Sequence, residues 1–106
     1  MFTAVLITCP DREVAERIAR ALLEERLAAC VNITGPLLSL FWWEGRIDRA
    51  EEFLLLVKTR TSLLERLIAR VRELHPYEVP EVVALPIIGG SEDYLAWLGE
   101  ETRSGA

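Results

Sequence analysis

The segment from His75 to Glu81, with the sequence HPYEVPE, constrains the fold more strongly than any other part of this chain. Each of its two prolines fixes its own φ angle and disfavours the helical conformation in the preceding residue. A helix that reaches residue 75 therefore ends there, and the chain continues as a stiff, extended loop. The segment also holds the only histidine and two carboxylates, so it is either a rigid connector or a binding site.

Four runs of apolar, aromatic or β-branched residues predict β-strands. They are Phe2–Thr8, Ala29–Trp43, Arg46–Thr59 and Val82–Ile88. Glu44-Gly45 is typical of a hairpin turn, and Gly35-Pro36 predicts a bulge within the second strand.

Helices are predicted between these strands by apolar residues spaced three and four apart. Asp11 is a good N-cap for the first helix, whose apolar stripe contains Val14, Ile18, Ala21 and Leu22. Ser62 and Glu65 form a capping box for the second helix, which carries Leu64, Leu67, Ile68 and Val71. Ser91 is expected to cap a short last helix.

The predicted order is βαββαβ with a C-terminal helix, an α+β arrangement called ferredoxin-like. Its 106 residues fit one domain, 1–106, in which residues 103–106 are expected to be a frayed tail. Right-handed crossovers place both long helices on one face of such a sheet, so the other face should be polar.

The predicted strands do not alternate between apolar and polar residues. Val5-Leu6-Ile7, Phe53–Val57 and Phe41-Trp42-Trp43 are apolar on both faces. Leaving two large aromatic side chains in water forfeits on the order of 8–12 kcal/mol of possible burial, comparable to the stability of a domain. We therefore expect an obligate homo-oligomer joined by sheet faces and strand edges. The pattern does not choose between two copies and three.

Composition excludes several classes of partner and reaction. The net charge of −5 argues against nucleic acid, and no apolar run approaches the ~18 residues that span a membrane. Two cysteines without CxxC spacing, and no secretory signal, predict reduced thiols in the cytoplasm. A single histidine leaves little scope for nucleophile–base catalysis, so we expect no enzymatic activity.

Five segments, in this order and at these spacings, resemble the CutA family of divalent-cation tolerance proteins over nearly the full length. They are Glu25–Asn32 (ERLAACVN), Trp43–Gly45 (WEG), Leu56–Thr59 (LVKT), His75–Glu81 (HPYEVPE) and Asp93–Leu98 (DYLAWL). The resemblance implies a ferredoxin-like subunit in a tightly packed homotrimer, located in the bacterial cytoplasm and linked to copper and other divalent cations. It also implies similarity to the trimers of PII signalling proteins, which bind effectors in clefts between subunits.

The metal ligands that this resemblance implies are His75 and Glu81. The family's strand-one cysteine position is occupied by Ile7 here, and Cys9 lies two residues later. Imidazole and carboxylate suit Cu(II), Zn(II) or Ni(II), although neighbouring copies or water must complete the shell. The alternative is that His75 is a hydrogen-bonded residue at the negative end of a helix dipole.

Five further residues are candidates for lining an inter-subunit cleft: Cys30, Lys58, Tyr77, Tyr94 and Trp97. Each also has a structural explanation. Cys30 is then a buried inert thiol, Lys58 a strand-end charge that reaches water, and the aromatics are core or interface residues. Cys9, close to the start of the first helix, is the better candidate for a reactive thiol.

Two functions follow from these expectations. The first is a non-enzymatic homotrimer that binds copper and contributes to tolerance of divalent metal ions, with no obligatory cofactor. The second is a PII-like sensing or scaffolding trimer that binds small molecules between its subunits.

Overall fold

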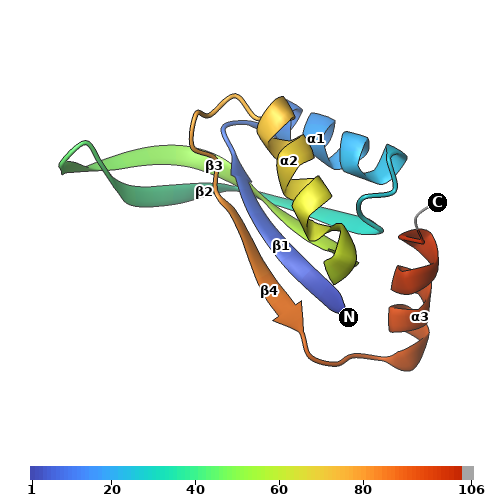
Figure 1. Cartoon of the computed structure of the whole chain (residues 1–106). Helices are drawn as coiled ribbons and strands as arrows, with labels where there is room; N and C mark the ends of the chain where they lie inside the picture. The colour runs from blue at the N-terminus through green and yellow to red at the C-terminus, as the bar shows by residue number, and fades with distance from the viewer. Residues whose placement is uncertain (104–106) are drawn as a thin grey trace.

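The structure, a computed structural model that describes residues 1–103, confirms the predicted order of elements (Figure 1). Strand and helix bounds differ from the predicted ones by only a few residues. The elements are β1 (Phe2–Cys9), α1 (Arg12–Glu24), β2 (Cys30–Trp43), β3 (Arg46–Arg60), the 3₁₀ turn η1 (Thr61–Leu63), α2 (Leu64–Leu74), β4 (Val82–Ile87) and α3 (Glu92–Glu101).

The four strands form one antiparallel sheet in the order β2-β3-β1-β4. Helices α1 and α2 lie together over one face of this sheet, as the crossover rule predicts (Figure 1). The register sets Val5 beside Val57 and Ile7 beside Leu55, and all four side chains are fully buried beneath the helices. Burying each such side chain contributes about 1.5–3 kcal/mol, so this layer forms the core.

Two of the three predicted helix caps are present. The Val14 amide donates to Asp11 Oδ1 over 2.8 Å, and the Tyr94 amide donates to Ser91 Oγ over 3.3 Å. The capping box predicted at Ser62 and Glu65 is wrong, because no side chain caps η1 or α2. The chain enters α2 through the 3₁₀ turn, so Ser62 lies inside a helical turn and not at an N-cap.

The β2–β3 hairpin departs from regular sheet geometry at the two predicted places. Glu44 and Gly45 both have positive φ angles, 51° and 82°, as a tight hairpin turn requires. The pairing register shifts between Thr34 and Leu37, which confirms the bulge. At Gly35, which has a φ of 147°, an added Cβ would lie 2.9 Å from Phe53 Cδ2, so a side chain does not fit.

Beyond this bulge the hairpin is a two-stranded ribbon. Strand β1 pairs only with residues 53–60 of β3, so residues 37–43 and 46–52 pair only with each other. The ribbon extends well past the rest of the sheet (Figure 1). One of its faces exposes Leu38, Leu40, Trp42 and Ile47, each between 54% and 73% accessible. This is the apolar surplus that the sequence predicts.

Helix α3 packs at the end of the sheet where β1 begins. Two arginines bind its last turn: Arg60 donates to the Gly99 carbonyl over 2.5 Å, and Arg26 donates to the Glu101 carbonyl and carboxylate over 3.2 and 2.7 Å. The predicted frayed tail is described only at Arg103, which forms an ion pair with Glu100; residues 104–106 lie outside the described part.

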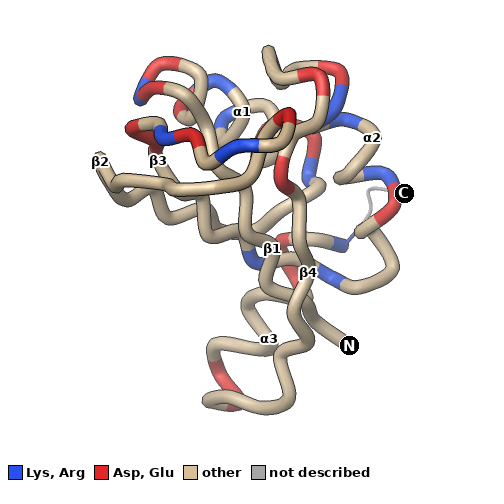
Figure 2. The backbone as a smooth tube through the Cα atoms, turned by 90° about the vertical axis from the view of Figure 1, so that its left-hand side faces the viewer, with Lys and Arg blue, Asp and Glu red and all other residues tan. Residues whose placement is uncertain are grey.

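Charged residues of both signs are interspersed over α1, α2 and the hairpin, whereas β4 carries few (Figure 2). The basic residues therefore do not follow a single stripe of the kind that tracks a phosphate backbone. Among residues 1–103, no helix combines the length and the apolar character needed to cross a bilayer.

Candidate functional site

The HPYEVPE segment ends helix α2 as its prolines predict. His75 has left the helical region, with φ −81° and ψ 134°, while its amide still donates to the Val71 carbonyl over 2.8 Å. The segment then leads into β4 and passes the carboxyl end of β1, where His75 contacts Thr8.

The imidazole of His75 is buried and hydrogen-bonded on both sides. Its Nδ1 accepts from the Tyr77 amide over 3.2 Å, so Nε2 carries the proton and donates to the Thr8 carbonyl over 2.7 Å. The ring also lies 4.8 Å from the Tyr77 ring, centre to centre. Since a metal needs a free nitrogen lone pair, ligation by His75 requires one of these hydrogen bonds to break. This geometry favours the alternative in which His75 is a structural residue at the helix end.

Glu81, the second predicted ligand, is exposed at the other end of the same segment. Within residues 1–103, no three side chains of His, Cys, Asp or Glu come close enough to hold a metal ion. A metal bound through Glu81 therefore needs ligands from another molecule or from water.

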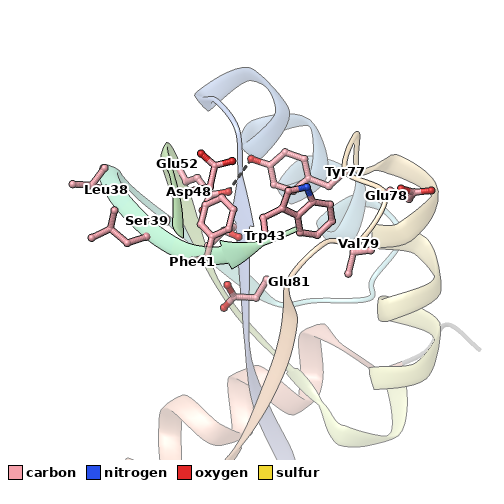
Figure 3. A pocket seen from close by; sticks show the side chains of 12 residues that line it. Leu38, Ser39, Phe41, Trp43, Asp48, Glu52, Tyr77, Glu78, Val79 and Glu81 are labelled. Carbon is pink, nitrogen blue, oxygen red and sulfur yellow. Dashed lines mark hydrogen bonds between the residues drawn. The ribbon is translucent and has the colours of Figure 1, made fainter. Parts of the chain in front are cut away.

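A pocket of about 710 Å³ lies between the HPYEVPE segment and the hairpin (Figure 3). Three aromatic residues line it, namely Phe41, Trp43 and Tyr77. Four carboxylates also line it: Asp48, Glu52, Glu78 and Glu81. The sequence did not indicate that the hairpin lines this pocket, because Phe41 and Trp43 were assigned to oligomer contacts.

Glu52 is the most informative of these residues because it is only 6% exposed. Its Oε2 accepts a hydrogen bond of 2.8 Å from the Tyr77 hydroxyl, which Figure 3 shows as a dashed line. Burial of Tyr77, together with this bond to Glu52, raises the pKa of Tyr77 to about 12, so the phenol remains a proton donor. Glu51, the neighbour of Glu52, is in contrast exposed.

Cys9 is fully buried, contrary to the prediction that it is the more reactive thiol. Its side chain faces the core, and burial followed by the nearby charges of Glu52 and Asp11 raises its pKa to about 12. A thiol at a helix start becomes reactive when the amides of the helix stabilise its thiolate. Here burial and two carboxylates oppose ionisation, so Cys9 is an inert core residue.

The predicted cleft residues divide into two groups. Lys58 Nζ and Cys30 Sγ both donate to Asn32 Oδ1, the latter over 3.9 Å. Burial and the adjacent Cys30 thiol raise the pKa of Tyr94, whose ring lies 5.5 Å from Trp97. Tyr94 and Trp97 belong to α3, so these four predicted residues form one cluster between α3 and the sheet, whereas Tyr77 lies at the opposite end of β1. Asn32, which joins the cluster, was not predicted.

Comparison with known proteins gives consistent results along the chain. The model of the CutA1 divalent ion tolerance protein family matches residues 3–101. The divalent-cation tolerance protein CutA of Thermus thermophilus is 56% identical over 102 residues, 96% of this chain and 99% of that protein. The solved Thermus structure superposes with a TM-score of 0.94 at 55% identity, covering 95% of this chain and 98% of that one.

More distant relatives show the same similarity. A structure described as a periplasmic divalent cation tolerance protein CutA, from Archaeoglobus fulgidus, has a TM-score of 0.94 at 45% identity and covers 96% and 99% of the two chains. The chloroplastic protein CutA of Arabidopsis thaliana is 49% identical over 94% of this chain and 55% of its own length. The chain thus belongs to the CutA1 divalent ion tolerance family, whose members are non-enzymatic.

Proposed function

We propose that this protein acts as a cytoplasmic homotrimer that binds copper and other divalent cations weakly and contributes to metal-ion tolerance. The observation that carries the proposal is the two-stranded ribbon, because a single chain leaves Leu40, Trp42 and Ile47 largely in water. Soluble monomers rarely expose a contiguous apolar patch of this kind, and such a patch usually marks a surface that another molecule covers. Packing against further copies would remove these side chains from water.

Metal binding in this proposal depends on Glu81. This carboxylate is exposed, and both imidazole and carboxylate are suitable ligands for Cu(II). Because one chain does not supply three ligands, a neighbouring copy or water completes the shell. His75 becomes a ligand only if its hydrogen bond to Thr8 or Tyr77 is broken. His75 should therefore contribute less to the Cu(II) affinity than Glu81.

Two measurements test this function. Native mass spectrometry of dilute protein should give three chains per particle, and a stable folded monomer would refute the assembly. Titration with Cu(II) should give a saturable signal that weakens in Glu81→Ala. Glu78→Ala is the matched control, because Glu78 is an exposed carboxylate of the same segment. Identical isotherms for wild type, Glu81→Ala and His75→Ala would exclude this metal site.

A second candidate function is PII-like sensing of a small molecule, which the 710 Å³ pocket supports. Its volume lies within the ~300–1,000 Å³ typical of ligand sites, and it combines apolar walls with a few polar groups. A metabolite screen by thermal shift should then find a compound that raises the melting temperature, since a ligand that binds only the folded state stabilises it. A screen without any hit would count against sensing.

A further inference from the structure

The pocket between the hairpin and the HPYEVPE segment has a distinctive chemical character. It is lined by aromatic rings and carboxylates, and none of the lysine, arginine or histidine side chains in the described part of the chain lines it. Within residues 1–103, none of its four carboxylates takes part in a salt bridge. The site is therefore complementary to a cation that also has apolar surface.

The spacing of the carboxylates distinguishes between a metal ion and an organic cation. Asp48 and Glu52 come from the hairpin, whereas Glu81 comes from the segment that precedes β4, and Figure 3 shows it apart from the other two. Because no three of these groups come within reach of one metal ion, they do not form a coordination shell. Ammonium groups at the two ends of a flexible chain can meet separated carboxylates one at a time.

Three aromatic rings line the pocket together with these carboxylates. Figure 3 shows the rings of Phe41, Trp43 and Tyr77 gathered between Glu52 and Val79. Such rings attract a cation over their faces and also pack against methylene groups. The Tyr77 hydroxyl holds the Glu52 carboxylate through Oε2, so this negative charge is already positioned before any ligand arrives.

From these contacts we propose that the pocket binds a linear aliphatic diamine or polyamine. Its methylene chain lies along Phe41 and Trp43, one ammonium group meets Glu52 and Asp48, and another meets Glu81. This inference rests on the second candidate function above and names the class of ligand. Because Glu81 belongs to both proposed sites, diamine binding and Cu(II) binding are measured separately.

Hexamethylenediamine is the probe, and calorimetry on the full chain is the measurement. We expect saturable binding of one diamine per chain. Hexanediol has the same carbon chain without charge, and magnesium chloride at equal ionic strength supplies charge without the carbon chain. Neither should bind with comparable affinity. Absence of saturable diamine binding, or equal binding of hexanediol, would overturn the proposal.

Three variants locate the site. Glu52→Gln and Glu81→Gln should each weaken diamine binding about tenfold or more, the range for losing a charge-assisted hydrogen bond. Glu51→Gln is the matched control, since it removes the same charge from the residue next to Glu52, and Glu51 is exposed and does not line the pocket. The affinity of this variant should stay within about twofold of wild type, because removing an exposed charge outside the pocket changes little. Equal weakening by Glu51→Gln and Glu81→Gln would show general attraction to an acidic protein and overturn the assignment.

Circular dichroism and native mass spectra of each variant separate binding from folding and assembly. If Glu52→Gln does not fold, Glu81→Gln and Trp43→Leu carry the test, since Glu81 and Trp43 are both exposed. A wild-type protein that binds Cu(II) and fails to bind diamine refutes this inference alone and leaves the tolerance function intact.

Discussion

Replacing His75 with alanine separates its two possible roles. Loss of a structural residue lowers the free energy of unfolding, whereas loss of a metal ligand weakens Cu(II) binding. His75 is 7% exposed, and its imidazole connects the Thr8 carbonyl to the Tyr77 amide through hydrogen bonds of 2.7 and 3.2 Å. Leaving such a buried partner without its hydrogen bond costs about 1–3 kcal/mol. Loss of the ring packed against Tyr77 adds about 0.5–1.5 kcal/mol.

We therefore expect His75→Ala to lower the free energy of unfolding by about 2–4 kcal/mol. At about 4 °C per kcal/mol for a domain of this size, the melting temperature falls by about 8–16 °C. Guanidinium unfolding, followed by circular dichroism at fixed protein concentration and in the presence of chelator, measures the change. Glu81→Ala is the control, and as an exposed substitution it should stay within about 0.5 kcal/mol of wild type. A His75→Ala variant that keeps its stability and loses Cu(II) binding would refute the structural role.

Three further predictions follow from the fold and the site. Gly35→Ala should destabilise the protein by about 1–3 kcal/mol in a thermal melt, because its Cβ collides with Phe53 and its φ is positive; an unchanged melting temperature would contradict this. A thiol reagent at neutral pH should label one cysteine per native chain, since Cys9 is buried with a pKa raised to about 12, and Cys30→Ser should abolish the labelling. The pKa of Tyr77 is raised from 10.0 to about 12, so the folded state holds this proton more tightly; the stability it contributes is complete below about pH 10 and is lost as the pH rises towards 12. Tyr77→Phe should flatten this alkaline decline in unfolding free energy, and equal slopes for both proteins would refute the assignment.

The elements of the fold could be predicted because their signals are local. Asp11 and Ser91 cap their helices through residues three positions away, and Glu44-Gly45 adopts positive φ angles that few other pairs tolerate. The capping box at Ser62 failed because the same residues also form a 3₁₀ turn, and the sequence pattern does not distinguish the two.

The pocket could not be predicted in the same way because it joins segments that are distant in the sequence. Glu52 is separated by 25 residues from Tyr77, which covers it, so neither strand periodicity nor its acidic neighbour indicates burial. The reactivity predicted for Cys9 was wrong for a related reason. The sequence shows that Cys9 precedes α1, but it does not show the core that surrounds the thiol. Family resemblance identified the segment that matters and left its partners on the hairpin unassigned.

The outer part of the β2–β3 hairpin has a consequence for amide hydrogen exchange. Two-stranded ribbons are marginally stable in water, so in a solitary chain the amides of residues 37–43 and 46–52 should exchange quickly, by local opening. The amides of β1, which has a partner strand on each side, should exchange slowly in every state. The ratio of these two rates therefore reports directly how much of the ribbon another surface covers, and it does so residue by residue.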